Sequence, residues 1–175
     1  MKKTAVISIS RLLSTGAIEL NLKSKDRDGV LAELVALVPQ IANQRDAQET
    51  LLKALHEREA LHSTGIGDGI ALPHARNGLV GLVDDPVIVF GRHPAGIDFG
   101  AIDKLPARLF FLLIAPTVTQ HLAVLARVGR SLRDPRVRHG LLSAEKATQV
   151  VAIFKESEKE FASNTPFNAP ISPQS

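Results

Sequence analysis

The segment from Ser63 to Arg76 holds residue types suited to chemistry on a phosphate, and it reads Ser-Thr-Gly-Ile-Gly-Asp-Gly-Ile-Ala-Leu-Pro-His-Ala-Arg. Its three alternating glycines let successive backbone N–H groups approach a ligand, as an anion-binding nest requires. A tight turn between a helix and a strand is the plainer alternative. The segment is no P-loop, because no Gly-Lys-Ser/Thr follows. The candidate phosphate-binding residues are Ser63, Thr64, Gly65 and Gly67.

His74 is the candidate nucleophile of this segment. It follows Pro73, whose ring fixes φ and biases Leu72 toward an extended conformation, so the imidazole is presented from stiff backbone. A neutral imidazole can attack and carry a phosphoryl group near neutral pH. The chain has no Cys, which excludes thiolate zinc sites, iron–sulfur clusters and cysteine nucleophiles. A lone histidine is more often structural, so its neighbours decide the interpretation.

Arg58 and His121 are the two polar residues that support a phosphate site. Leu51, Leu55 and Arg58 share one face of a predicted helix that ends at the glycines. A guanidinium there can bind phosphate oxygens, although it can also simply reach into solvent. His121 lies in the first turn of another predicted helix, where the helix dipole favours anions. We infer a phosphate site formed by these residues and the glycine segment.

Interleaved strands and helices must position these residues. Asp28 is expected to cap the first helix, the capping box Thr117-Val-Thr-Gln120 to begin the third, and Pro135 to end it. The pattern predicts an α/β fold, a single domain with a central mixed, mostly parallel β-sheet flanked by helices on both faces. Apolar periodicity predicts strands at 18–22, 70–72, 86–90 and 108–115, and helices at 29–42, 47–61, 118–132, 137–142 and 145–161.

Length and composition limit the classes of protein. The 175 residues are 45% hydrophobic and 22% charged, which fits one folded domain. We expect it over 1–161, followed by a disordered tail over 162–175. The aromatic residues are all Phe, which disfavours sites built on stacked Trp or Tyr. Because Arg11 interrupts the first apolar stretch and no apolar run could span a bilayer, we expect a cytoplasmic protein without membrane insertion.

The segment Ile66-Gly-Asp-Gly-Ile-Ala-Leu-Pro-His-Ala75, preceded at six residues by Glu59, resembles a long and specific active-site signature. It is that of the fructose/mannitol-type (type-2) enzyme IIA proteins of the bacterial phosphoenolpyruvate-dependent phosphotransferase system, which include nitrogen-related regulatory members. The blocks 97–116 and 121–125 resemble later parts of the same family, so the similarity runs from about Ser10 to Glu156.

This resemblance implies a mannitol-type enzyme IIA fold, with His74 as the phosphoryl acceptor and with Arg58 and His121 bracing the group. It implies phospho-HPr as the donor and no metal or cofactor. A sugar-specific member passes the phosphoryl group to a IIB domain, whereas a nitrogen-related member binds regulatory target proteins. A chain without a fused HPr or IIB segment favours the regulator.

Two other classes of function receive less support. A metal enzyme is disfavoured because His56 and His62 point to different faces of a helix and no His-x-x-x-His pair occurs. A nucleic-acid binder would use a stripe of arginines, but the net charge of +3 is small, and we expect no nucleic-acid partner. The stripe is a solvated helix face or helps to dock an acidic protein; it comprises Arg127, Arg130, Arg133, Arg136 and Arg138.

Overall fold

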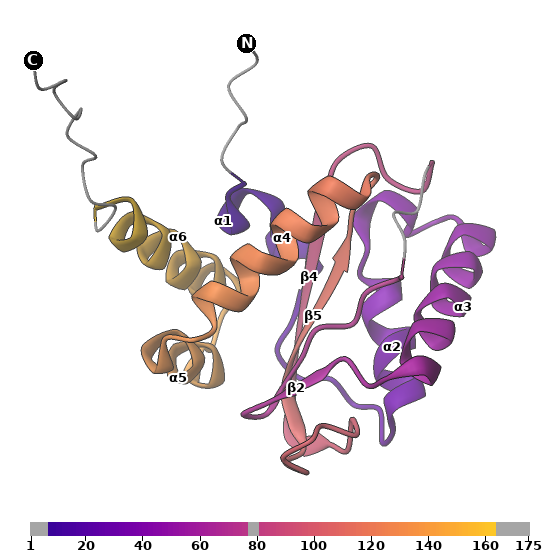
Figure 1. The fold of residues 1–175 in the computed structure, drawn as a ribbon, viewed down its shortest axis with the longest axis horizontal. Helices are drawn as coiled ribbons and strands as arrows, with labels where there is room; N and C mark the ends of the chain where they lie inside the picture. Colours follow the sequence, from indigo (N-terminus) through magenta and orange to yellow (C-terminus); the bar gives the residue numbers. More distant parts are fainter. Residues whose placement is uncertain (1–6, 77–80, 164–175) are drawn as a thin grey trace, which may run out of the picture.

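The structure is a computed structural model that describes residues 7–76 and 81–163. Five strands form one sheet in the order β1-β4-β5-β3-β2 (Figure 1). The pairs β1·β4 and β3·β5 are parallel, and β4·β5 and β2·β3 are antiparallel, so the expected mixed sheet is confirmed. The strands are β1 (Ile18–Glu19), β2 (Gly65–Gly67), β3 (Ile70–Ala71), β4 (Val87–Ile97) and β5 (Ala107–Ile114).

Helices cover both faces of this sheet, as expected. Helices α2 and α3 lie on one face, and α1, α4, α5 and α6 lie on the other (Figure 1). Within the described residues, no helix is both long enough and apolar enough to cross a lipid bilayer. The helices are α1 (Ile9–Leu12), α2 (Arg27–Ala36), α3 (Arg45–Leu61), α4 (Val118–Ser131), α5 (Pro135–Ser143) and α6 (Ala147–Ser163), with 3₁₀ turns at Thr15–Ala17 and Pro39–Ile41.

Strand β5 explains the continuous apolar run of the sequence. Its side chains alternate between the two faces, so Phe110 and Leu112 pack toward α2 and α3. Phe111 and Leu113 pack toward α1 and α4 to α6. Because helices cover both faces, both sets must be apolar, and the alternation expected of a half-exposed strand is absent.

The first predicted helix is displaced toward the N-terminus. Asp26, and not Asp28, caps it by accepting the Gly29 N–H at 2.8 Å, so α2 begins at Arg27. It ends at Ala36 and not at 42, because the chain turns into a 3₁₀ helix that starts with a proline.

Strand β4 is longer than the predicted strand 86–90 and continues to Ile97. The polar residue Arg92 ends the apolar pattern but not the strand. Its Nη1 donates to the carbonyl oxygens of Leu141, Leu142 and Ala144 at 3.1, 2.9 and 2.7 Å. The end of α5 therefore satisfies a partly buried guanidinium that lies beyond the predicted strand.

Other boundaries differ by a few residues. The strand predicted over 18–22 is reduced to β1. Pro135 ends α4 as predicted but also begins α5, where its missing N–H is not needed. Helix α6 continues through Ser163, two residues into the predicted tail, whereas residues 164–175 lie outside the described part of the chain.

Candidate active site

His74 lies just beyond the end of β3, beside the central strand β5. It forms an isolated parallel bridge with Leu113 of β5, whose N–H donates to the Pro73 carbonyl at 3.0 Å. The His74 Nδ1 lies 2.7 Å from the Leu72 carbonyl oxygen. Since a carbonyl oxygen only accepts, Nδ1 carries the proton of the neutral ring. The lone pair is therefore on Nε2, which leaves that atom as the nucleophile.

The side chain of His121, on helix α4, lies next to the ring of His74. It lies in the first turn of α4, where Thr117 accepts the Gln120 N–H at 3.2 Å and confirms the predicted cap. The two imidazole centroids are 5.1 Å apart and inclined by 42°. The structure thus brings together two histidines that the sequence separates by nearly fifty residues, and His121 is only 8% exposed.

Burial keeps both rings neutral near neutral pH. Desolvation lowers the pKa of His74, and the Arg58 cation lowers it further, against the opposing effects of the Leu72 hydrogen bond and the Glu59 carboxylate. Burial also lowers the pKa of His121, and His74 adds to this shift. A neutral His74 keeps the lone pair that nucleophilic attack requires.

Arg58 stands at the end of α3, beside the same cavity as His74. Its Nη1 donates to the His62 carbonyl oxygen at 2.7 Å, which closes the last turn of the helix. Arg58 and His74 both line an open cavity of about 1130 Å³. The guanidinium therefore combines a helix-capping contact with a place at the cavity where its charge acts on His74.

The glycine segment forms the β2–β3 hairpin. Gly67, Asp68 and Gly69 all have positive φ, at 90°, 53° and 73°. The Asp68 N–H donates to the Asp103 carboxylate at 2.8 Å, so this amide binds an anion of the protein itself. The φ of 90° at Gly67 is a conformation that residues with a Cβ rarely adopt, which is why glycine is needed there.

The predicted phosphate-binding residues have specific partners. The Ser63 hydroxyl donates to the Phe99 carbonyl and accepts the Gly65 N–H at 2.9 Å. Ser63, Thr64 and Gly67 line the cavity with His74. Their binding of phosphate stays a prediction.

Glu59 is the residue whose importance the sequence interpretation missed. Its side chain is only 6% exposed, and it accepts the Thr64 hydroxyl and, at 3.1 Å, the Thr64 N–H. The Thr64 carbonyl accepts the Leu72 N–H at 3.0 Å, and Leu72 holds His74. A chain of hydrogen bonds therefore joins the buried carboxylate to the imidazole.

The sequence carried a signal for Glu59. The buried residues of α3 are Leu51, Leu55 and Glu59, which follow one another at four-residue spacing. Arg58 lies next to that stripe and is half-buried. The charge that is buried on the apolar face of α3 is therefore the carboxylate.

The family model described as "Phosphoenolpyruvate-dependent sugar phosphotransferase system, EIIA 2" matches residues 11–157. The chain belongs to the EIIA 2 family.

Among the residues that the structure describes, no three histidine or acidic side chains converge as a metal site would require.

Relatives of this EIIA 2 protein include both branches of the family. A fructose-specific EIIA component of Haloferax volcanii is 35% identical over 153 residues, covering 86% of this chain and 97% of that protein. A nitrogen regulatory protein of Pseudomonas aeruginosa is 33% identical over 150 residues, covering 85% of this chain and 95% of that one. A fructose-specific EIIABC component of Bacillus subtilis is 34% identical over 155 residues, but the match covers 87% of this chain and only 24% of that protein.

Solved structures share the fold. The nitrogen regulatory protein IIA-Ntr of Neisseria meningitidis superposes with a TM-score of 0.72 at 28% identity, covering 83% of this chain and 98% of that one. A complex of enzyme IIAMTL and phosphorylated enzyme IIBMTL from Escherichia coli matches with a TM-score of 0.69, over 83% of this chain and 99% of that one. At 21% identity, the latter shows the fold alone.

Proposed function

We propose that this EIIA 2 protein is a histidine phosphocarrier that accepts a phosphoryl group from a phospho-HPr-type carrier on Nε2 of His74. The observation that carries the proposal is the hydrogen bond from Nδ1 to the Leu72 carbonyl, which leaves the lone pair on Nε2. The lowered pKa of His74 and the cavity beside it agree with this role.

The transfer needs no proton movement on the acceptor. The bond between phosphorus and the donor nitrogen breaks as the bond between phosphorus and Nε2 forms, and the donor nitrogen regains its electron pair. Nδ1 keeps its proton and its bond to the Leu72 carbonyl. Such a transfer asks the protein mainly for positioning and for stabilisation of charge.

We assign this stabilisation to Arg58 and His121. Arg58 supplies a fixed positive charge at the cavity, and the neutral His121 offers a ring N–H close to His74. Ser63, Thr64, Gly65 and Gly67 remain candidates for contacts with the phosphoryl oxygens. Glu59 is a positioning residue, since it acts on His74 through Thr64 and Leu72.

For the downstream role we favour a nitrogen-related regulator that binds target proteins. This is supported by the likeness in fold and sequence to IIA-Ntr of Neisseria meningitidis. The second candidate is a sugar-specific enzyme IIA that passes the group to a IIB domain, supported by the 35% identity to the fructose-specific protein. A cytoplasmic location stays a prediction of the sequence.

Phosphorylation in a purified system tests the proposal. With enzyme I, an HPr-type carrier and phosphoenolpyruvate, intact-mass measurement should show one added phosphoryl group that is acid-labile and base-stable. ATP alone, or phosphoenolpyruvate alone, should add none. No added phosphate in the complete system would contradict the proposal. Adding IIB domains to the phosphorylated protein then separates the two branches, because only the sugar-specific enzyme should lose its label to one of them.

A further inference from the structure

Three arginines line the cavity without a part in the phosphoryl-accepting step. Arg130 lies in the last turn of α4, Arg133 lies in the connection to α5, and Arg138 lies on α5. We call these three residues the arginine wall. They line the same cavity as His74 and Arg58.

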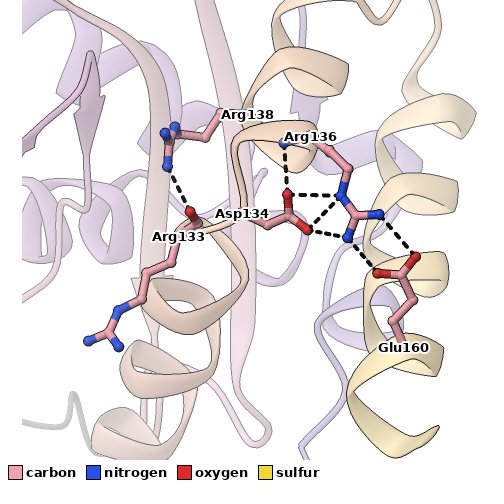
Figure 2. A network of polar contacts seen from close by, with 5 residues as sticks. All are labelled: Arg133, Asp134, Arg136, Arg138 and Glu160. Atoms are coloured by element: carbon pink, nitrogen blue, oxygen red, sulfur yellow. Dashed lines mark hydrogen bonds and ion pairs between the residues drawn. The ribbon is translucent and has the colours of Figure 1, made fainter. Parts of the chain in front are cut away.

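The other two arginines of the predicted basic stripe each lie within 4.0 Å of a carboxylate of the same chain. The Arg136 Nη2 lies 2.7 Å from both an Asp134 and a Glu160 carboxylate oxygen, and these two partners raise the pKa of Arg136 (Figure 2). The Arg127 Nε lies 4.0 Å from the Glu158 carboxylate. The stripe therefore divides into two arginines that have a carboxylate within 4.0 Å and the three of the arginine wall.

The arginine wall has no such partners. In residues 7–76 and 81–163, no carboxylate oxygen lies within 4.0 Å of a nitrogen of its side chains. Figure 2 shows the Arg133 side chain pointing away from the cluster of Asp134, Arg136 and Glu160. The positive charge of the Arg133 guanidinium is therefore not paired with a carboxylate of the described residues.

Two of the three arginines are held in place by contacts that leave their charge intact. The Arg138 Nη1 donates to the carbonyl oxygens of Leu132 and Arg133 at 2.7 and 3.1 Å, at the end of α4. The Arg130 guanidinium carbon lies 4.8 Å from the centroid of the Phe161 ring. Side chains already held in position lose less conformational entropy when a partner binds.

The cavity concentrates positive charge next to the reacting histidine. Four arginines, the wall and Arg58, line it with one carboxylate, that of Asp68. Leu125 and the 56% exposed Ile66 add apolar surface to the same lining. Apolar surface beside clustered arginine is typical of a contact with a protein.

We propose that the arginine wall is a docking surface for an acidic face of the protein that exchanges the phosphoryl group with His74. The proposal rests on the proposed function, because a protein that brings a phosphorylated residue to His74 must cover the cavity. Complementary charge there would speed the encounter and select the partner. Duplex nucleic acid fits less well, since it needs a longer basic surface without apolar lining.

Charge reversal at the wall gives the first test. We would measure kcat/KM for phosphoryl transfer from the phosphorylated HPr-type carrier to Arg133→Glu and to the double variant Arg130→Glu/Arg133→Glu. At low salt the double variant should lose about 10- to 100-fold, mostly through KM, and the loss should shrink at high salt because screening weakens steering. Circular dichroism and thermal unfolding check that both variants are folded.

Lys146→Glu is the matched control. It makes the same change of charge at an exposed residue just before α6 that does not line the cavity. Its transfer kinetics should equal those of the wild type. A wild-type KM in the double variant, or an equal loss in Lys146→Glu, would overturn the docking surface while leaving the phosphocarrier function standing.

A binding measurement tests the wall without any phosphorylation. Fluorescence anisotropy of a labelled poly-glutamate peptide should show binding to the wild type and to His74→Ala, and loss of binding to the double variant. If labelling of His74 failed but this pattern held, the proposed function would fall and the acidic docking surface would stand. Equal binding of poly-glutamate to the wild type and to the double variant would overturn the acidic docking surface. Binding of random duplex DNA to the wild type that is tighter than binding of poly-glutamate would also overturn it.

Discussion

Histidines 74 and 121 have the same side chain but different surroundings, and their roles should separate on substitution. His74→Ala should abolish labelling, because among residues 7–76 and 81–163 His74 is the only histidine that lines the cavity. His121→Ala should still be labelled but more slowly, since Arg58 remains to stabilise charge. His121→Gln, which keeps an N–H donor, should recover part of the rate. Rapid-quench kinetics and peptide mapping under alkaline conditions provide the readout, and phosphate found on position 121 would reverse the assignment.

Arg58 should matter for rate far more than for stability. A charge-assisted hydrogen bond is worth about 1.5 to 3 kcal/mol, so Arg58→Ala should slow phosphorylation roughly 10- to 150-fold. Arg45→Ala, at the exposed start of the same helix, is the control and should keep the wild-type rate. Single-turnover transfer from the phosphorylated carrier measures both. Wild-type kinetics in Arg58→Ala would limit the role of Arg58 to its hydrogen bond with the His62 carbonyl oxygen.

At the scale of elements, Glu59 connects helix α3 to the hairpin β2–β3 that leads to His74. Replacing it by Gln keeps the shape and both contacts with Thr64, because the amide oxygen can accept the Thr64 N–H and the amide nitrogen can donate to the Thr64 hydroxyl. Because the charge that strengthens these hydrogen bonds is lost, we expect a loss of about 1 kcal/mol in the free energy of unfolding, measured with urea. Glu57→Gln, on the exposed side of the same helix, should change little.

A purely structural Glu59 would change stability alone. As a positioning residue it should also change the pH profile of phosphorylation, because its carboxylate raises the pKa of His74 against the larger effect of burial. Glu59→Gln should therefore shift the acid limb of the rate profile to lower pH. An unshifted profile in a folded variant would confine Glu59 to stability.

At the scale of the whole molecule, the half-buried His74 and the buried His121 should make the protein less stable in acid. Both have a folded pKa below the ordinary value of 6.5. Between the folded and unfolded pKa values, the unfolded chain binds more protons, so stability rises with pH. This contribution is fully present above the unfolded pKa and is lost as the pH falls below it.

Urea unfolding between about pH 5 and about pH 7.5 measures this dependence. His74→Ala and His121→Gln should each flatten the curve, and the exposed His139→Ala should not. A curve of the same steepness in the double variant His74→Ala/His121→Gln would assign the acid sensitivity to other groups.

Local patterns in the sequence determined several helix and strand positions and the sheet architecture of this protein. The Pro73–His74 pair, the Thr117 cap and the apolar run of β5 were visible in the sequence, because caps, turn residues and burial on both faces leave their marks within a few neighbouring residues. The interleaving of strands and helices was likewise enough to predict a mixed sheet covered on both faces.

Tertiary structure decided the rest, since it depends on residues far apart in the chain. The approach of His121 to His74 exists only because α4 packs across β5. The sequence could not show that Arg136 would meet Glu160, because the two partners come from different helices, or that no carboxylate of residues 7–76 and 81–163 would pair with Arg133. Strand β4 continues past Arg92 in its pairing with β5, and the end of α5 accepts the Arg92 guanidinium. In each case the energy of a polar group is set by a contact in space, which no local pattern of residue types encodes.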